Sequence, residues 1–406
     1  MAYHYLLAGP GNVWPGVSSR FQDGMLHTPE THDDLAEALN RASRHLRTIC
    51  LQGSGSKSMM AGAVTWADET VTTTALGRVL EYEPRDLTIS VEAGLPWREL
   101  TALLRQNRQM VPLDPPFAAR ATVGGVVASN SSGPRRRLYG TARDMVIGMG
   151  FVTLERKLVQ SGGMVVKNVA GLDMAKLMIG SFGTLAAIVV VNFRVQPMPE
   201  VERTVLVSFA DSKAVFGARA RLLSSVLQPA AIDLFNPPAA VQGSAAWILA
   251  VRAAGNQSAV DRYQRELSAL GDSQVLEGAP HEEFWQQVED STPRFLAAHA
   301  DGAVVRVSST LMDLEKFMAP LAVPAVARAG SGVCYIYFDE TSPAVRYLAE
   351  AAGLGLKAVI EFAPEARKPE LELWPAPGAD FEIMRRLKAL FDPSNVLNSG
   401  RLYNRI

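Results

Sequence analysis

The spacing of hydrophobic and polar residues divides the chain into two regions, of which the first mixes helix and strand patterns. Between residues 25 and 199 these patterns alternate, with many glycines among them. The runs "DDLAEALNRASRHL" and "PWRELTALLRQN" have apolar residues at helical spacing, the second with Pro96 in its first turn, so both predict helices. The runs "LTISVEAG", "DMVIGMGFVTL" and "IVVVNFRVQPMP" predict strands bounded by turn residues or prolines. The first region therefore predicts a mixed α/β domain.

After Pro199, strand and helix patterns follow one another regularly and glycine becomes less frequent. The strand patterns "RTVLVSF", "AAWILAVRA", "GAVVRVSS" and "VCYIYF" each precede a helix pattern, which predicts an antiparallel sheet with helices on one face. A last helix pattern, "FEIMRRLKALFD", leads into "PSNVLNSGRLY", a tail expected to pack back onto the first region. The expected divisions, with the main boundary at Pro197–Glu200, are an N-terminal extension (1–24), an α/β domain (25–199), an α+β domain (200–390) and a C-terminal tail (391–406).

Composition and charge restrict the kinds of partner and location. A chain of 406 residues with 48% hydrophobic and 20% charged residues is typical of two soluble domains. Its formal net charge of -1 gives no field toward nucleic acid, so an anionic ligand must be held by local groups. The run Leu185–Val191 is far shorter than the roughly 20 residues of a membrane helix and predicts a buried strand. The N-terminus lacks a signal-peptide pattern, which indicates a cytoplasmic protein, with peripheral membrane association through partners left open.

Cysteine and histidine provide few metal ligands. Cys50 and Cys334 are the only cysteines, too few for this chain to hold an iron–sulfur cluster or a structural zinc by cysteine ligation. No histidines have the spacing of a metal motif, and His281, in the helix pattern "HEEFWQQVED", is expected on a solvated face. We therefore expect no metal site.

The stretch "QGSGSKS" is the first candidate for chemistry. Glycines let successive amide groups converge on one anion, while Ser54, Ser56 and Lys57 add side-chain donors, so the stretch fits a diphosphate. Its spacing is neither that of the nucleotide P-loop nor that of the Rossmann fingerprint. From these residues alone, a mobile turn is an equal alternative.

Two further glycine-rich segments follow. The segment from Asp114 to Asp144 is rich in Gly, Ser, Asn and Pro, which is typical of a functional loop. Its basic run Arg135–Arg137 could pair with phosphate or with a partner chain, and contact with solvent is the default. The run "GLDMAKLMIGSFGTLAAIVVV" places Gly180 and Gly183 before a strand, where close helix–strand packing is the simplest explanation.

Taken in this order, the three segments resemble the vanillyl-alcohol-oxidase, or PCMH-type, FAD-binding family. The motifs "QGSGSK", "TVGGVVASNSSGPRR", "VKNVAGLD", "GSFGTL" and "FDPSNVLNSGRLY" look most like those of its FAD-binding E-type subunits of glycolate oxidase. The resemblance implies an α+β fold: a PCMH-type FAD-binding domain of two α/β subdomains, then an α+β cap domain with an antiparallel sheet. It also implies non-covalently bound FAD.

The resemblance also implies which residues contact FAD. Its diphosphate loop corresponds to Gly53, Ser54, Gly55, Ser56 and Lys57, and its adenosine half corresponds to Arg143 and Asp144, with Ile188 as a backbone contact to adenine. The segment along the flavin and diphosphate corresponds to Pro115, Thr122, Val123, Gly124, Gly125, Ser129, Asn130, Ser132 and Gly133.

For function, the resemblance implies an FAD-binding subunit of a glycolate oxidase complex. Expected partners are a homologous catalytic flavoprotein (D-type) and an iron–sulfur subunit (F-type), which would carry electrons from glycolate oxidation to glyoxylate. The chain lacks the histidine-rich cap motif of catalytic relatives, and "GSFGTLA" has Phe182 and Ala186 where Glu and Gly are common. Arg252 and Arg306 could hold a substrate carboxylate, but the sequence nominates no catalytic base. A self-sufficient 2-hydroxy-acid dehydrogenase for D-lactate or glycolate, and a structural subunit with a degenerate FAD site, stay open as alternatives.

Overall fold

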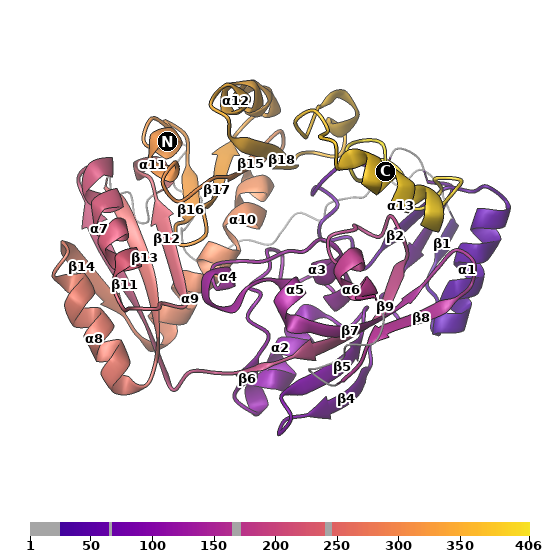
Figure 1. Ribbon diagram of the computed structural model, residues 1–406, viewed down its shortest axis with the longest axis horizontal. Helices are drawn as coiled ribbons and strands as arrows, with labels where there is room; N and C mark the ends of the chain where they lie inside the picture. Colours follow the sequence, from indigo (N-terminus) through magenta and orange to yellow (C-terminus); the bar gives the residue numbers. More distant parts are fainter. Residues whose placement is uncertain (1–24, 65–66, 165–171, 240–245) are drawn as a thin grey trace.

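Four sheets organise the part of the chain that the computed structural model describes, which is residues 25–64, 67–164, 172–239 and 246–406. Two sheets form the first region and one large sheet forms the second, with a two-stranded pair between them (Figure 1). The expected N-terminal extension (1–24) and residues 166–171 of "VKNVAGLD" lie outside the described residues.

The first sheet is small and parallel, in the order β1-β3-β2, with strands β1 (Met25–His27), β2 (Ile49–Gln52) and β3 (Glu69–Thr72). Helix α1 (His32–Arg44) begins where the Thr31 hydroxyl accepts a hydrogen bond from the backbone N–H of Asp34. Its buried residues Leu35 and Leu39 share a core with this sheet and with the next one. The apolar spacing in the sequence therefore predicted this helix correctly.

The second sheet is antiparallel, in the order β4-β5-β9-β7-β8. The expected apolar strand lies at its centre as β9, because both faces of this strand are covered. The strands are β4 (Val79–Glu83), β5 (Thr88–Glu92), β7 (Val146–Val152), β8 (Leu158–Gly162) and β9 (Ala187–Arg194). The helices of this subdomain are α2 (Trp97–Gln106), α3 (Val123–Ala128), α4 (Arg136–Tyr139), α5 (Ala142–Met145) and α6 (Met174–Met178).

The third sheet is the cap sheet, whose eight strands are all antiparallel in the order β14-β11-β13-β12-β16-β17-β15-β18. A short pair, β6 (Gln109–Met110) and β10 (Gln196–Pro197), precedes it. The strands are β11 (Val201–Phe209), β12 (Ala231–Phe235), β13 (Trp247–Gly255), β14 (Asp272–Leu276), β15 (Ala303–Ser308), β16 (Ala325–Arg328), β17 (Val333–Phe338) and β18 (Lys357–Phe362).

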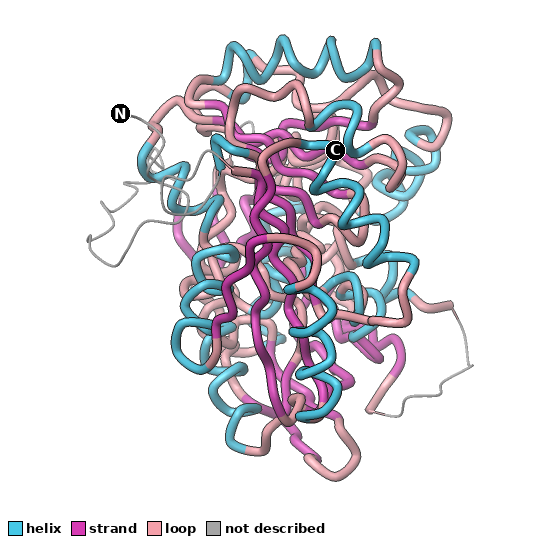
Figure 2. The backbone as a smooth tube through the Cα atoms, turned by 90° about the vertical axis from the view of Figure 1, so that its left-hand side faces the viewer, coloured by secondary structure: helices cyan, strands magenta, loops and turns pink. Residues whose placement is uncertain are grey.

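Both faces of the cap sheet are covered by helices. Alternate residues of β13 such as Leu249 and Val251 pack under one helical layer, while Ile248 and Ala250 face the opposite layer and the first region. Figure 2 shows helices on either side of the strands. The outer helices are α7 (Ser212–Ser224), α8 (Gln257–Ser268), α11 (Leu314–Met318) and α12 (Thr341–Gly353). The inner helices are α9 (Gly278–Glu289) and α10 (Ser291–Ala298).

The predicted fold class, a two-part α/β region followed by an α+β cap with an antiparallel sheet, is confirmed. Helices cover two faces of the cap sheet rather than the one expected, because α9 and α10 fill the space toward the first region. The domain bounds given above stay a prediction. Within the described residues, no helix has the length and apolar character needed to cross a bilayer.

The chain ends on the first region. Two short 3-10 helices, η1 (Pro237–Ala239) and η3 (Lys368–Glu370), lie in the second half of the chain. The last helix, α13 (Phe381–Phe391), runs above β2, as Figure 1 shows in yellow. Val396 and Leu397 then join the core formed by α1 and β2, and the Asn398 side chain hydrogen-bonds the backbone of Leu51. The last residues of the chain therefore support the start of the first glycine-rich loop.

Candidate functional site

The first glycine-rich loop, Gly53–Lys57, follows β2 and lies against the second. Gly55 has a φ of +69°, a conformation that glycine adopts without strain. A Cβ atom on Gly53 would lie 2.1 Å from the Thr122 hydroxyl, so only glycine permits this approach. The Gly53 carbonyl also accepts a hydrogen bond of 3.0 Å from Thr72. The loop is therefore a turn held by close packing and by a hydrogen bond to its backbone.

The second loop packs its glycines against neighbouring backbone. Thr122 begins α3 and accepts a hydrogen bond from the N–H of Gly125. A Cβ atom on Gly124 would lie 2.7 Å from that of Ala93, and one on Gly133 would lie 2.1 Å from the Asp114 carbonyl oxygen. These close approaches fix the main chain of the segment.

The third loop joins the second through backbone hydrogen bonds. The N–H of Gly180 donates to the carbonyl of Val127 (3.2 Å), and that of Phe182 donates to Ala128 (2.9 Å). The Asn398 amide donates to the Phe182 carbonyl (2.8 Å) as well as to Leu51. The structure thus brings all three glycine-rich loops together around one place.

The other residues expected at FAD occupy different environments. Val123 and Ile188 are buried core residues, and Pro115 is buried in the second loop. Ser129, Asn130, Ser132 and Gly133 line a cavity described below. Of the first loop, Ser54 is exposed, while Ser56 is partly buried.

Arg143 and Asp144, expected near the adenosine half, are exposed on α5. The Arg143 guanidinium donates to the Lys176 carbonyl (2.6 Å), while the Asp144 carboxylate accepts from the Thr141 backbone (2.8 Å). The Arg143 bond therefore reaches the third glycine-rich run, whereas the Asp144 bond stays within the second segment. Their role at FAD stays a prediction.

Buried polar atoms without partners test whether the loops fit an anionic cofactor. The Lys57 ammonium is buried and, among the described residues, has no hydrogen-bond partner. Burial lowers the pKa of Lys57 to about 7, because a charged ammonium loses its hydration there. The Asn130 carbonyl oxygen is also buried without a partner. A diphosphate would supply the missing partner of Lys57, so the residues fit FAD.

Two basic side chains from near the end of the chain bind the backbone that directly follows the first loop. The Lys368 ammonium donates to the Ser58 carbonyl (2.7 Å), and the Arg401 guanidinium donates to the carbonyls of Ser58 (3.3 Å) and Gly62 (2.9 Å). The sequence analysis gave neither residue a role. The only sequence signal was the resemblance of "NSGRLY", which contains Arg401, to the family's closing motif.

A cavity of about 290 Å³ lies between the glycine-rich loops and the cap. The first region contributes Ser129–Gly133, Gly180, Phe182 and Arg136, while α9, α10 and the cap sheet contribute polar groups opposite them. The cap residues include Glu289, Thr292, Arg306, Arg328, Tyr335 and Glu361. This volume is near the lower end of sites for small organic ligands.

Three sequence expectations about charged residues need correction. The run Arg135–Arg137 is not a solvated surface, because Arg135 pairs with Asp114 (3.3 Å), Arg136 lines the cavity and Arg137 reaches the Pro229 carbonyl of the cap (3.3 Å). His281 is buried rather than solvated, since α9 faces the first region. Of the two carboxylate-binding candidates, Arg306 lines the cavity and Arg252 does not.

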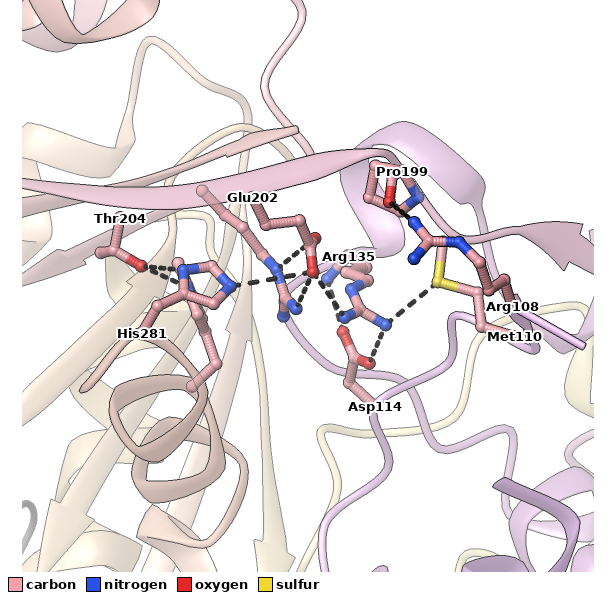
Figure 3. A network of polar contacts seen from close by, with 10 residues as sticks. Arg108, Met110, Asp114, Arg135, Pro199, Glu202, Thr204 and His281 are labelled. Carbon is pink, nitrogen blue, oxygen red and sulfur yellow. Dashed lines mark hydrogen bonds and ion pairs between the residues drawn. The ribbon is translucent and has the colours of Figure 1, made fainter. Parts of the chain in front are cut away.

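Arg252 belongs instead to a network between the first region and the cap, which Figure 3 shows around Glu202. The Glu202 carboxylate accepts two hydrogen bonds of 2.9 Å from Arg252 and pairs with Arg135 at 3.8 Å and with His281 at 3.7 Å. Burial opposes ionisation of Glu202, but His281, Arg252 and Arg135 more than offset it, so the pKa of Glu202 lies well below its usual range.

This lowered pKa predicts an acid-sensitive contribution to stability. The Glu202 contribution is full above the unfolded-state pKa of about 4.3 and is lost as the pH falls below it. We expect Glu202→Gln to lower the free energy of unfolding by about 2–3 kcal/mol at pH 7, because a buried ion network is broken, and by less at pH 3. Urea unfolding of both proteins at several pH values tests this. An equal difference at pH 7 and pH 3 would contradict it.

Among the described residues, no three His, Cys, Asp or Glu side chains gather as metal ligands. The free thiols Cys50 and Cys334 are buried and far apart in the sequence.

Known proteins resemble the chain along its length. Residues 25–162 match the family described as FAD binding domain, and residues 372–402 match the FAD linked oxidases, C-terminal domain. The chain is 28% identical to glycolate oxidase subunit GlcE of Escherichia coli (strain K12), over 93% of this chain and 99% of that protein. It is 25% identical to glycolate oxidase subunit GlcD of Bacillus subtilis (strain 168), over 92% of this chain and 88% of that protein.

Solved structures share the fold at low sequence identity. A 4-ethylphenol oxidase from Gulosibacter chungangensis superimposes with a TM-score of 0.70 at 12% identity, covering 94% of this chain and 89% of that one. An alkyldihydroxyacetonephosphate synthase gives 0.68 at 17% identity, covering 92% and 76%. At these identities the likeness concerns the fold alone.

Proposed function

Because the chain belongs to the PCMH-type family of FAD-linked oxidases, we propose that it is the FAD-binding subunit of a complex that oxidises glycolate to glyoxylate. One observation carries this proposal: the similarity to glycolate oxidase subunit GlcE extends over 93% of this chain and 99% of that protein. FAD is the cofactor, and the chain is a subunit of an FAD-linked oxidoreductase.

We assign different groups of residues to the cofactor and to the substrate. Bound FAD supplies a two-electron acceptor for the oxidation of an alcohol carbon. We assign the diphosphate to the loop Gly53–Lys57, with the unpartnered Lys57 ammonium as its cation. We assign the flavin side to the second loop, where Gly124 and Gly125 allow close approach, and the substrate to the cavity beyond Ser129–Gly133.

The proposed partners follow from what the chain lacks. Two cysteines are too few for a cluster held by four cysteines, so we propose that electrons leave through a separate iron–sulfur subunit. A homologous flavoprotein subunit would complete the complex, since this chain is similar to both glycolate oxidase subunits GlcE and GlcD. We place the complex in the cytoplasm, with membrane association through partners only.

Co-purification tests the whole proposal. The tagged chain, expressed with its genomic neighbours, should purify with a second flavoprotein and an iron–sulfur protein, and should contain one FAD per chain. The complex should oxidise glycolate, whereas the isolated chain should be yellow and slow. A colourless isolated chain, or one that oxidises glycolate rapidly without partners, would contradict the proposal.

A second candidate is a self-sufficient 2-hydroxy-acid dehydrogenase. The observation in its favour is the cavity, which has arginine and glutamate side chains of this chain's own beside the flavin loops. Rapid anaerobic bleaching of the flavin by glycolate or D-lactate in the isolated chain would favour this candidate.

Lys57→Met tests the diphosphate assignment. Removing a buried amine without a partner should leave the melting temperature of the FAD-free protein unchanged or higher. The same change should weaken FAD binding by about tenfold or more, because a charge-assisted hydrogen bond to phosphate is lost. Fluorescence titration with FAD and thermal melting of the FAD-free protein give the two values. A large loss of apoprotein stability, or an unchanged affinity, would remove Lys57 from the site.

A further inference from the structure

The charged groups around the cavity pair with one another almost completely. Arg306 donates to Glu361 at 3.0 Å, and Arg328 forms an ion pair with the buried Asp233 behind it. Asp114 pairs with Arg135 at 3.3 Å. These three pairs neutralise most of the charge that faces the cavity.

Two wall residues with acidic or basic side chains, Arg136 and Glu289, form neither a hydrogen bond nor an ion pair with any described residue, although Arg136 lies near enough to Glu361 to act on its charge. Arg136 begins α4 on the side of the first region, and Glu289 ends α9 on the side of the cap. A guanidinium without a partner in a small cavity favours a planar anion.

We propose that Arg136 and Glu289 are the two ends of a site for a small 2-hydroxy monocarboxylate, with Arg136 holding the carboxylate and Glu289 hydrogen-bonding the hydroxyl. The site rests on the proposed function for the nature of its ligand. Of the two arginines that the sequence nominated for the carboxylate, Arg252 does not line the cavity and Arg306 is already paired with Glu361.

The protonation of Glu289 sets the charge that the ligand meets. Burial, and then the nearby Asp114, raise the pKa of Glu289 to about 8, against the opposing effects of Arg135 and Arg252. At pH 7 the side chain is therefore mainly a neutral carboxyl group, and Arg136 leaves the cavity with one uncompensated positive charge. The other charged or titratable groups near Glu289 or on the cavity wall are Asp290, Arg306, Arg328, Tyr335 and Glu361.

This arrangement gives the pH dependence of binding a definite sign. A neutral Glu289 can hydrogen-bond a hydroxyl without repelling a carboxylate, whereas an ionised Glu289 repels it. Because the pKa of Glu289 is raised to about 8, its ionised fraction increases between pH 7 and pH 9. Glycolate should therefore bind several-fold more weakly at pH 9 than at pH 7.

Equilibrium dialysis with labelled glycolate and acetate tests the site without turnover. The FAD-loaded chain is first reduced with dithionite under anaerobic conditions, so that glycolate binds but is not oxidised. The wild type should prefer glycolate to acetate, which lacks only the hydroxyl. Arg136→Gln should weaken the binding of both ligands by about 10- to 100-fold, because a charge-assisted hydrogen bond to the carboxylate is lost.

Two substitutions separate the roles of Glu289. Glu289→Gln keeps a neutral hydrogen-bonding group, so it should keep the preference for glycolate and lose the pH dependence. Glu289→Leu should lose the preference as well. The controls are Glu283→Gln, exposed on the same helix, and Arg137→Gln, whose guanidinium reaches the cap instead of the cavity. Both controls should bind like the wild type.

The outcomes distinguish the site from the proposed function. A flavin-loaded chain whose Arg136 and Glu289 variants bind both ligands like the wild type overturns the site and leaves the proposed function standing. A chain that takes up no flavin overturns the proposed function, and the effects of Arg136 and pH on glycolate binding then still decide the site in the flavin-free chain.

Discussion

Gly55→Val is expected to remove most bound FAD while the cap stays folded. Gly55 has a φ of +69°, and a β-branched residue there strains the backbone of the loop that we assign to the diphosphate. A strain of about 1–3 kcal/mol, resolved by a shift of the loop, should weaken FAD binding by about tenfold or more. The measurement is flavin absorbance per chain after gel filtration, with the dissociation constant from fluorescence titration.

Gly217→Val is the matched control for this change. Gly217 lies in α7, and a Cβ atom there would meet nothing within 4 Å. Valine in an exposed helix is slightly more favourable than glycine, so neither flavin content nor stability should fall. An FAD affinity of Gly55→Val equal to that of Gly217→Val would show that the loop does not hold the cofactor.

Lys388→Met is expected to destabilise the chain by about 3–5 kcal/mol, because it leaves a buried carboxylate without its cation. The Lys388 ammonium donates to Asp392 (2.7 Å) and to the carbonyls of Thr184 (2.8 Å) and Leu397 (2.7 Å). Asp392 is buried and also accepts from the N–H of Leu397 (2.8 Å). Urea unfolding measures the loss.

Lys316→Met provides the same substitution at an exposed ion pair. Lys316 pairs with Asp313 at 2.7 Å, and its loss should change the unfolding free energy by less than about 0.5 kcal/mol. In the Lys388→Met/Asp392→Asn double variant, the loss should be smaller than the sum of the two single losses. Equal losses of unfolding free energy in Lys388→Met and Lys316→Met would show that the buried contacts of Lys388 do not stabilise the chain more than an exposed ion pair does.

The sequence predicted elements whose packing is visible in local spacing. Helix α1 could be predicted because Leu35 and Leu39 are spaced to lie on one side of a helix. Strand β17 could be predicted from a short run of apolar residues. The strands β12, β14 and β16 were not predicted. The run of β16, "AVAR", is short and rich in alanine, and it becomes a strand because β12 and β17 pair with it on either side.

Of the candidate site, the sequence predicted only the parts that a local residue pattern marks. The glycines at 53 and 55 predicted a turn, and Gly55 has the positive φ of one. Glu289 carried no such signal, because only the packing of α9 between the cap sheet and the first region places it at the cavity. Arg136 lies in the charged run Arg135–Arg137. The local sequence does not show that these three side chains have different neighbours, of which only that of Arg136 is the cavity.

The support of the first loop by Lys368, Asn398 and Arg401 also orders events during synthesis. The Asn398 amide donates a hydrogen bond to the Leu51 carbonyl, and the two residues are 347 positions apart in the sequence. The first loop is therefore synthesised long before the residues that support it. The glycine-rich turn is finished only when the final segment has emerged and docked. We therefore expect uptake of the cofactor to be a late step in maturation, because a chain interrupted before residue 398 has the loop without the contacts that hold it.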